Sequence, residues 1–157
     1  MMRKKISPID PASLEADTKS TYPEAFQQPV SGRRKRRIGP LAQLKHLSAV
    51  HVELPPGCAS SLRVWHSHED ELIIVTEGEL TLITEDGEEI MRAGHIAGFP
   101  AGAVNGHQIV NRSAHKAVFV EVASFDEQNT STYPDHDLLL IPDGRGRRFV
   151  RKDGTPY

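Results

Sequence analysis

Apolar and polar residues alternate in short runs through the middle of the chain. From Leu41 onward, turn residues interrupt the apolar runs about every 8–12 positions, a spacing typical of an all-β sandwich or barrel. No window of helical length shows a convincing 3.6-residue period, so the pattern predicts strands rather than helices. The expected strands cover residues 47–54, 61–66, 71–76, 79–84, 88–92, 96–99, 107–110 and 117–123.

The first 31 residues differ from this body. They are rich in Ser, Pro, Gln and Thr and show little periodicity, so we expect an arm that is either disordered or packed on a neighbouring subunit through Tyr22 and Phe26. The run Arg-Arg-Lys-Arg-Arg follows at residues 33–37. Because runs of like charge are usually solvated, we interpret this one as a linker rather than a nucleic-acid contact.

The end of the chain contains one further hairpin candidate. Residues 138–141 and 148–151 are strand-like and flank a Pro-Asp-Gly-Arg-Gly turn. Two strands alone are barely stable in water, so this hairpin should lie on the barrel or on a partner subunit. The chain therefore divides into an N-terminal arm with a basic linker, a β-barrel, and a C-terminal extension with a β-hairpin, over residues 1–40, 41–123 and 124–157.

Charge is distributed unevenly over these parts. Residues 1–40 carry 9 basic and 4 acidic side chains, whereas residues 41–123 carry 5 basic and 11 acidic ones. An acidic barrel argues against a nucleic-acid-binding surface on the barrel itself. The length of 157 residues is enough for one domain with a buried core.

Several absences in the sequence limit where we expect the protein to work. No apolar run approaches the roughly 20 residues of a membrane-spanning helix, and the basic start has no apolar stretch behind it that would make a secretory signal. Cys58 is the single cysteine, which excludes an internal disulfide framework. We therefore expect a cytoplasmic protein. We also expect a homodimer, because the arm and the hairpin could cover sheet edges that the barrel leaves open.

One histidine-rich stretch carries candidate chemistry. Residues 65–71 read Trp-His-Ser-His-Glu-Asp-Glu. Alternation along a strand puts His66 on one face, together with His68 if the strand persists, so the two imidazoles could share one ion. Glu71 could add an oxygen from the next strand, and His107 a third imidazole from a later one. Imidazole and carboxylate together suit a divalent Zn, Fe, Mn or Ni ion.

The spacing of these residues resembles a known family. Residues 57–78 resemble the first cupin motif, G-x5-HxH-x3,4-E-x6-G, and residues 94–111 resemble the second, G-x5-PxG-x2-H-x3-N. The chain as a whole resembles small single-domain bacterial cupins, the cupin type-2 conserved barrels, which have no firmly assigned reaction. The resemblance implies a double-stranded β-helix, or jelly-roll barrel. It also implies a divalent metal ion, for which the candidate ligands are His66, His68, Glu71 and His107.

The first motif can be aligned in two ways. If Glu71 is the motif glutamate, the usual spacing puts the histidine pair at positions 64 and 66, and position 64 is Val64. The other alignment pairs His66 with His68 and leaves a shorter gap before Glu71. We expect His66, Glu71 and His107 as the smallest ligand set, with His68 as the candidate fourth ligand.

The resemblance selects the scaffold and leaves the reaction open. The first hypothesis is a metal-dependent oxidoreductase or isomerase, with dioxygenase, isomerase or lyase chemistry on a small organic molecule. The alternative is a non-catalytic barrel that binds or senses a sugar or another metabolite, which Val64 favours because it replaces a motif histidine. A third hypothesis gives the basic run and the tails a role in binding a partner. No residue is assigned a catalytic role from the sequence, and neither a nucleic acid nor a membrane is an expected partner.

Overall fold

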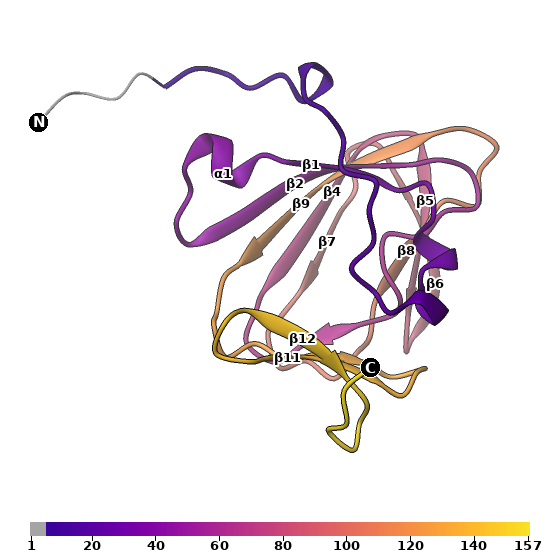
Figure 1. The fold of residues 1–157 in the computed structure, drawn as a ribbon. Coiled ribbons are helices and arrows are strands. Elements are labelled where there is room, and N and C mark those ends of the chain that lie inside the picture. Colours follow the sequence, from indigo (N-terminus) through magenta and orange to yellow (C-terminus); the bar gives the residue numbers. More distant parts are fainter. Residues whose placement is uncertain (1–5) are drawn as a thin grey trace, which may run out of the picture.

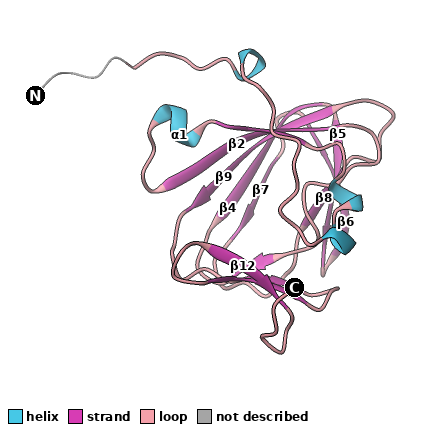
Figure 2. Ribbon diagram, in the orientation of Figure 1, coloured by secondary structure: helices cyan, strands magenta, loops and turns pink. Residues whose placement is uncertain are grey.

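Antiparallel β-strands make up most of the structure, a computed structural model that describes residues 6–157. Figure 2 shows that the helices in it are short turns. They are α1 (Gly39–Ala42) and three 3-10 turns at Pro11–Ser13, Glu24–Phe26 and Gln28–Val30. No helix in residues 6–157 is long and apolar enough to cross a bilayer. The predicted all-β class is confirmed.

The largest sheet has five strands in the order β1-β2-β9-β4-β7 and occupies the left side of Figure 1. In β2, buried Val50, Val52 and Leu54 alternate with more exposed neighbours, so one face of the sheet turns to the core. This is the alternation that the sequence predicted. The strand bounds are β1 (Arg34–Arg37), β2 (Leu47–Leu54), β4 (Glu71–Glu77), β7 (Ile96–Phe99) and β9 (Ala117–Ser124).

A second sheet with the order β6-β5-β8 packs on that apolar face. Its strands are β5 (Glu79–Thr84), β6 (Gly87–Arg92) and β8 (Gln108–Val110). The shared core is formed by Leu80, Met91 and Ile109 from this sheet and by Val50, Val52, Leu54, Ile73, Val75 and Phe119 from the larger one. Two layers around one core are the predicted jelly roll, although the hydrogen-bonded ladders of the described strands do not join into a closed cylinder.

The predicted C-terminal hairpin is present and lies on the jelly roll. It consists of β11 (Leu138–Pro142) and β12 (Arg147–Val150). Two more strands, β10 (Ser131–Tyr133) and β3 (Trp65–His66), extend it to a four-stranded sheet with the order β12-β11-β10-β3, at the bottom of Figure 1. Because β3 also belongs to the histidine-rich stretch, the hairpin is connected directly to the candidate site.

The N-terminal arm packs on its own chain, which corrects the expectation of a disordered or partner-bound segment for the residues described from position 6 onward. Tyr22 is buried, with its ring centroid 5.6 Å from that of Tyr133 and 5.4 Å from that of Phe149. Phe26 packs at the edge of the same cluster. The physical reason is that the four-stranded sheet exposes an apolar face that the jelly-roll core does not cover, and the aromatic rings of the arm cover it.

The basic run is a strand and not a solvated linker. Residues 34–37 form β1, and all four pair with β2, from Arg34 opposite Glu53 to Arg37 opposite Val50. Alternation explains how five consecutive cations fit there. Arg34 and Arg36 lie on the outer face, where each forms an ion pair with Glu53, at 3.4 and 3.5 Å. Lys35, between them, and Arg33, directly before the strand, line an interior cavity described below.

Two residues of the cupin-like motifs have structural roles. Gly78 links β4 to β5 with φ +77°, and a Cβ atom there would come within 2.8 Å of the backbone oxygen of Lys116. Asn111 is fully buried, and its side-chain amide donates hydrogen bonds to the carbonyl oxygens of Leu54 and His115, at 2.8 and 2.7 Å. Both residues fix loops of the jelly roll and neither touches the candidate ligands.

Candidate metal centre

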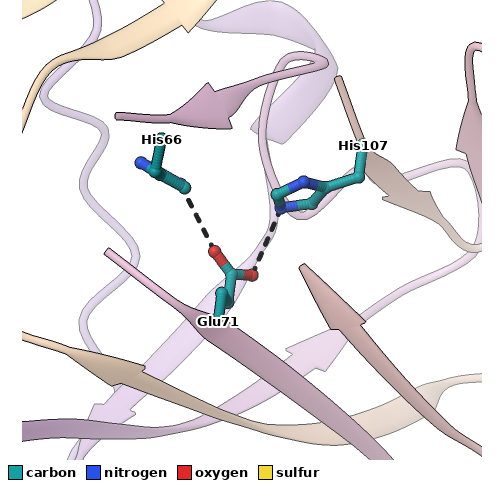
Figure 3. A group of neighbouring side chains, drawn as sticks. All are labelled: His66, Glu71 and His107. Carbon is teal, nitrogen blue, oxygen red and sulfur yellow. Dashed lines mark ion pairs between the residues drawn. The ribbon is translucent and has the colours of Figure 1, made fainter. Parts of the chain in front are cut away.

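Three of the four predicted ligands meet at one point inside the fold, as Figure 3 shows. The Nε2 atom of His66 lies 3.3 Å from one carboxylate oxygen of Glu71, and the Nε2 atom of His107 lies 3.5 Å from the other. One donor atom from each residue lies within 4.8 Å of the other two. The side chains are largely buried, with exposed fractions of 17% for His66, 11% for Glu71 and 4% for His107.

The sheet topology brings these residues together from distant parts of the chain. Glu71 is the first residue of β4, where its backbone pairs with Phe99 on one side and Ala123 on the other. His66 ends β3, the edge strand of the C-terminal sheet. His107 precedes β8 and exchanges backbone hydrogen bonds with Val64, at 2.8 and 3.0 Å. Each ligand is thus attached to a strand or a bridge, which favours a fixed geometry.

Neighbouring side chains orient both imidazoles. The Nδ1 atom of His66 lies 3.1 Å from the hydroxyl of Ser131 and 3.3 Å from the amide nitrogen of Asn129. The ring of His107 stacks on the ring of Phe99, with centroids 3.7 Å apart and an angle of 9° between the planes. A hydrogen-bond partner at the second ring nitrogen, as in His66, is typical of histidines that ligate metals, whereas the Nδ1 atom of His107 is buried without a hydrogen-bond partner among the described residues. Asn129 and Ser131 belong to the C-terminal extension, and the sequence did not predict their role.

The donor set fits a divalent metal ion. Two imidazole nitrogens and a carboxylate on one small volume match the ligand preference of Zn, Fe, Mn or Ni. Burial by itself raises the pKa of Glu71, but the hydrogen bonds from His107 and His66 outweigh it, so the pKa lies well below its ordinary value. The Glu71 carboxylate is therefore ionised at neutral pH and available as a ligand.

His68, the candidate fourth ligand, lies outside this cluster. The strand β3 ends at His66, so the alternation that would carry residue 68 to the same face stops. His68 is exposed, its Nδ1 atom contacts the hydroxyl of Ser67 at 2.8 Å, and its backbone N–H donates to the side chain of Asn129. Val64 is buried in the second apolar cluster, so neither alignment of the first motif supplies a second histidine.

We expect that His68→Ala leaves the metal content of the purified protein unchanged. The imidazole faces solvent and the backbone contact with Asn129 does not depend on the side chain. Elemental analysis of this variant beside wild type and His66→Ala is the measurement. A fall in the metal content of His68→Ala to the level of His66→Ala would restore His68 as a ligand.

The three clustered residues line a cavity of about 320 Å³, which we call the charged cavity. It lies between the five-stranded sheet and the C-terminal strands. Arg147, on β12, pairs with Glu69 there. The remaining charged residues on its wall are Arg33, Lys35 and Glu121. His66 and His107 also line a second cavity of about 420 Å³. The apolar residues on its wall include Trp65, Leu82, Ile96 and Phe99.

Glu121 is a carboxylate on the inner face of the large sheet. It stands opposite Ile73 on β4 and Val50 on β2, on the same face as Glu71. Its side chain forms no hydrogen bond or ion pair with residues 6–157 within the usual distances. Burial, followed by repulsion from the charge of Glu71, raises the pKa of Glu121 above its ordinary value. The sequence offered one clue to this residue, a single carboxylate within the apolar run of β9.

Comparison with known proteins gives the same fold for nearly the whole chain. Residues 50–123 match the cupin domain. A sugar phosphate isomerase of the cupin superfamily from Silicibacter pomeroyi has a crystal structure with 39% sequence identity, a TM-score of 0.91 and coverage of 96% of both chains. No curated protein matches the chain.

Two more distant solved structures share the fold alone. A putative sugar phosphate isomerase from Acidithiobacillus ferrooxidans has 22% identity, a TM-score of 0.72 and 80% coverage of both chains. A predicted oxalate decarboxylase from Thermotoga maritima has 17% identity and a TM-score of 0.62, with 76% of this chain and 100% of that chain covered. With the jelly roll, the domain match and the Silicibacter relative taken together, this chain belongs to the cupin superfamily.

Proposed function

We propose that this protein is a metal-dependent isomerase that interconverts the aldose and ketose forms of a phosphorylated sugar. The observation that carries the proposal is the convergence of His66, Glu71 and His107 on the wall of the charged cavity. The Silicibacter pomeroyi protein, named a sugar phosphate isomerase, supports the reaction class because the similarity extends over nearly the whole of both chains. The cavity volume lies within the range of roughly 300–1,000 Å³ that small-molecule sites have.

In this proposal, the Nε2 atoms of His66 and His107 and the carboxylate of Glu71 hold one divalent ion. Three protein ligands leave coordination positions open for the oxygen atoms of a substrate. Such an ion supplies Lewis-acid polarisation of a sugar carbonyl. The contacts of His66 with Ser131 and Asn129, and of His107 with Phe99, hold the two rings in place for it.

Isomerisation of this kind needs a group that moves a proton between neighbouring carbons. A proton leaves C2 and returns to C1, a second one moves from O2 to O1, and no co-reactant is consumed. We assign the carbon-to-carbon transfer to the carboxylate of Glu121, which lines the same cavity and has no partner among the described residues. As a diagonal neighbour of Glu71 on adjacent strands, it stands about 7–8 Å from that ligand at the backbone.

The proposal is tested with the purified protein, a chelator and a panel of aldose and ketose phosphates. We expect about one metal ion per chain by elemental analysis, and interconversion by NMR that stops after chelation and incorporates deuterium from D₂O. Glu121→Gln should keep the metal and lower kcat by about 10²–10⁴-fold, as loss of an acid–base group does. Glu127→Gln, at an exposed position beyond β9, is the matched control.

The alternative function is a barrel that binds a sugar without converting it. Val64, an apolar residue at a position where the motif has a histidine, favours this reading. It predicts that sugar phosphates raise the Tm of the protein while no member of the panel is converted. That result, or a protein purified without stoichiometric metal, would overturn the isomerase proposal.

A further inference from the structure

Lys35 of β1 and Arg33, directly before β1, line the charged cavity without an ion pair to a carboxylate of residues 6–157. Alternation along β1 separates Arg34 and Arg36, which pair with Glu53 outside, from Arg33 and Lys35, which line the cavity. Arg33 donates one hydrogen bond to the backbone oxygen of Ser60. The backbone of Lys35 exchanges hydrogen bonds with that of Asp17, but its ammonium group has no hydrogen bond or ion pair with residues 6–157 within the usual distances.

Burial makes this arrangement unfavourable without a counter-charge. Desolvation lowers the pKa of both Arg33 and Lys35, and the charge of Arg33 lowers the pKa of Lys35 further, whereas the carboxylate of Glu121 acts in the opposite direction on both. Glu121 lines the same cavity but forms no ion pair with either cation. Arg147 is already neutralised by Glu69. Arg33 and Lys35 are thus the cations of this cavity that no ion pair among the described residues neutralises.

Several residues with hydroxyl groups line the same cavity as Arg33 and Lys35. Tyr22 lines the same cavity, and its hydroxyl accepts a hydrogen bond from the backbone N–H of Leu62 at 3.3 Å. Ser60, Ser61 and Thr21 also line the cavity. A guanidinium, an ammonium and several hydroxyls around one volume form the environment that binds phosphate or carboxylate oxygens.

We propose that Arg33 and Lys35 form an anion subsite of the charged cavity, which holds the anionic group of the substrate while the rest of the molecule extends toward His66, Glu71 and His107. This inference rests on the proposed function for the presence of a substrate in the cavity. The ligand chemistry is a tetrahedral phosphate monoester or a carboxylate. Both cations lie outside the segment 50–123 that matches the cupin domain, so that segment alone does not contain the subsite.

The test measures anion binding directly, with inorganic phosphate and acetate as separate probes. Isothermal titration calorimetry is performed on the protein as purified, on Lys35→Met and on the control Arg34→Met, which removes a cation from the outer face of the same strand. We expect saturable binding of phosphate that weakens at least about tenfold in Lys35→Met and stays within about twofold in Arg34→Met. Stronger binding of acetate than of phosphate would assign the subsite to a carboxylate.

A second measurement does not depend on a variant that folds. Phosphate should protect Lys35 from acetylation by a soluble reagent, as followed by mass spectrometry of the wild-type chain. Equal phosphate affinity in Lys35→Met and wild type, or no protection of Lys35, would overturn the subsite.

The metal ion is a competing site for phosphate, so His107→Ala is included. Lysine-dependent phosphate binding that persists in His107→Ala supports the subsite. Binding that disappears in His107→Ala but not in Lys35→Met places the anion on the metal ion and overturns it. If phosphate binds through Lys35 and no sugar phosphate is converted, the subsite stands and the isomerase proposal fails, so the two outcomes are distinguishable.

Discussion

Glu71→Gln yields a folded protein without stoichiometric metal and without turnover. This is the largest effect that we expect on function. The amide has nearly the shape of the carboxylate but no charge, so the imidazoles of His66 and His107 lose the anionic ligand between them. Changes in groups that merely support ligands cost about 10–100-fold in metal affinity, and the loss of a direct ligand should exceed that range. Elemental analysis and calorimetric titration with Zn and Mn measure it.

Glu77→Gln is the control for this experiment. It is the same change on the same strand, at a position where Glu77 is exposed and pairs with Lys116 at 3.3 Å. The control should retain wild-type metal content. If Glu71→Gln also retained about one metal ion per chain, with circular dichroism unchanged, then Glu71 would not be a ligand and the proposed centre would be wrong.

Arg147→Ala destabilises the protein by about 3 kcal/mol, the second large effect that we expect. Glu69 is 8% exposed, and its carboxylate accepts hydrogen bonds from Arg147 and from Asn129 at 2.9 Å. Removal of the guanidinium leaves a buried carboxylate without its counter-charge, and broken buried pairs cost about 3–5 kcal/mol. Because Asn129 also contacts His66, the loss extends to the support of one imidazole.

Urea unfolding gives the free energy for this comparison. Arg148→Ala, at the next and exposed position of β12, is the matched control and should change the free energy of unfolding by no more than about 0.5 kcal/mol. The double variant with Glu69→Gln should recover part of the loss, since it removes the orphaned charge together with its partner. A loss in Arg147→Ala equal to that of the control would mean that the pair contributes nothing measurable.

The strands of the jelly roll could be predicted because their periodicity follows directly from burial on one face. In β2, the alternation of Val50, Val52 and Leu54 with His51 and Glu53 has one structural solution in a half-buried sheet. The convergence of His66, Glu71 and His107 was predicted from the resemblance to the cupin motifs. Strand periodicity alone does not predict which strands lie side by side. The predicted division of the chain at residues 40 and 123 stays a proposal about its organisation.

The parts that could not be predicted depend on contacts distant in sequence. Whether His68 joins the cluster is decided by the end of β3, which in turn depends on its pairing with β10, a three-residue strand too short to recognise by pattern. The prediction of a solvated linker for the basic run was wrong, because the pairing of these residues with β2 and the inward position of Lys35 depend on the folded sheet and not on local charge. The role of Glu121 could not be predicted either, because its position on the inner face of β9 also depends on the folded sheet.

Both flanks of the matched segment contribute walls to the charged cavity, Arg33 and Lys35 before it and Tyr133 and Arg147 after it. In the proposed function, the residues that determine substrate selectivity thus lie in different sequence segments from the residues that hold the metal ion. Mutation in the flanks can then retune selectivity while the reactive centre stays intact. We expect relatives with this central segment and different termini to share a chemistry and to differ in what they accept.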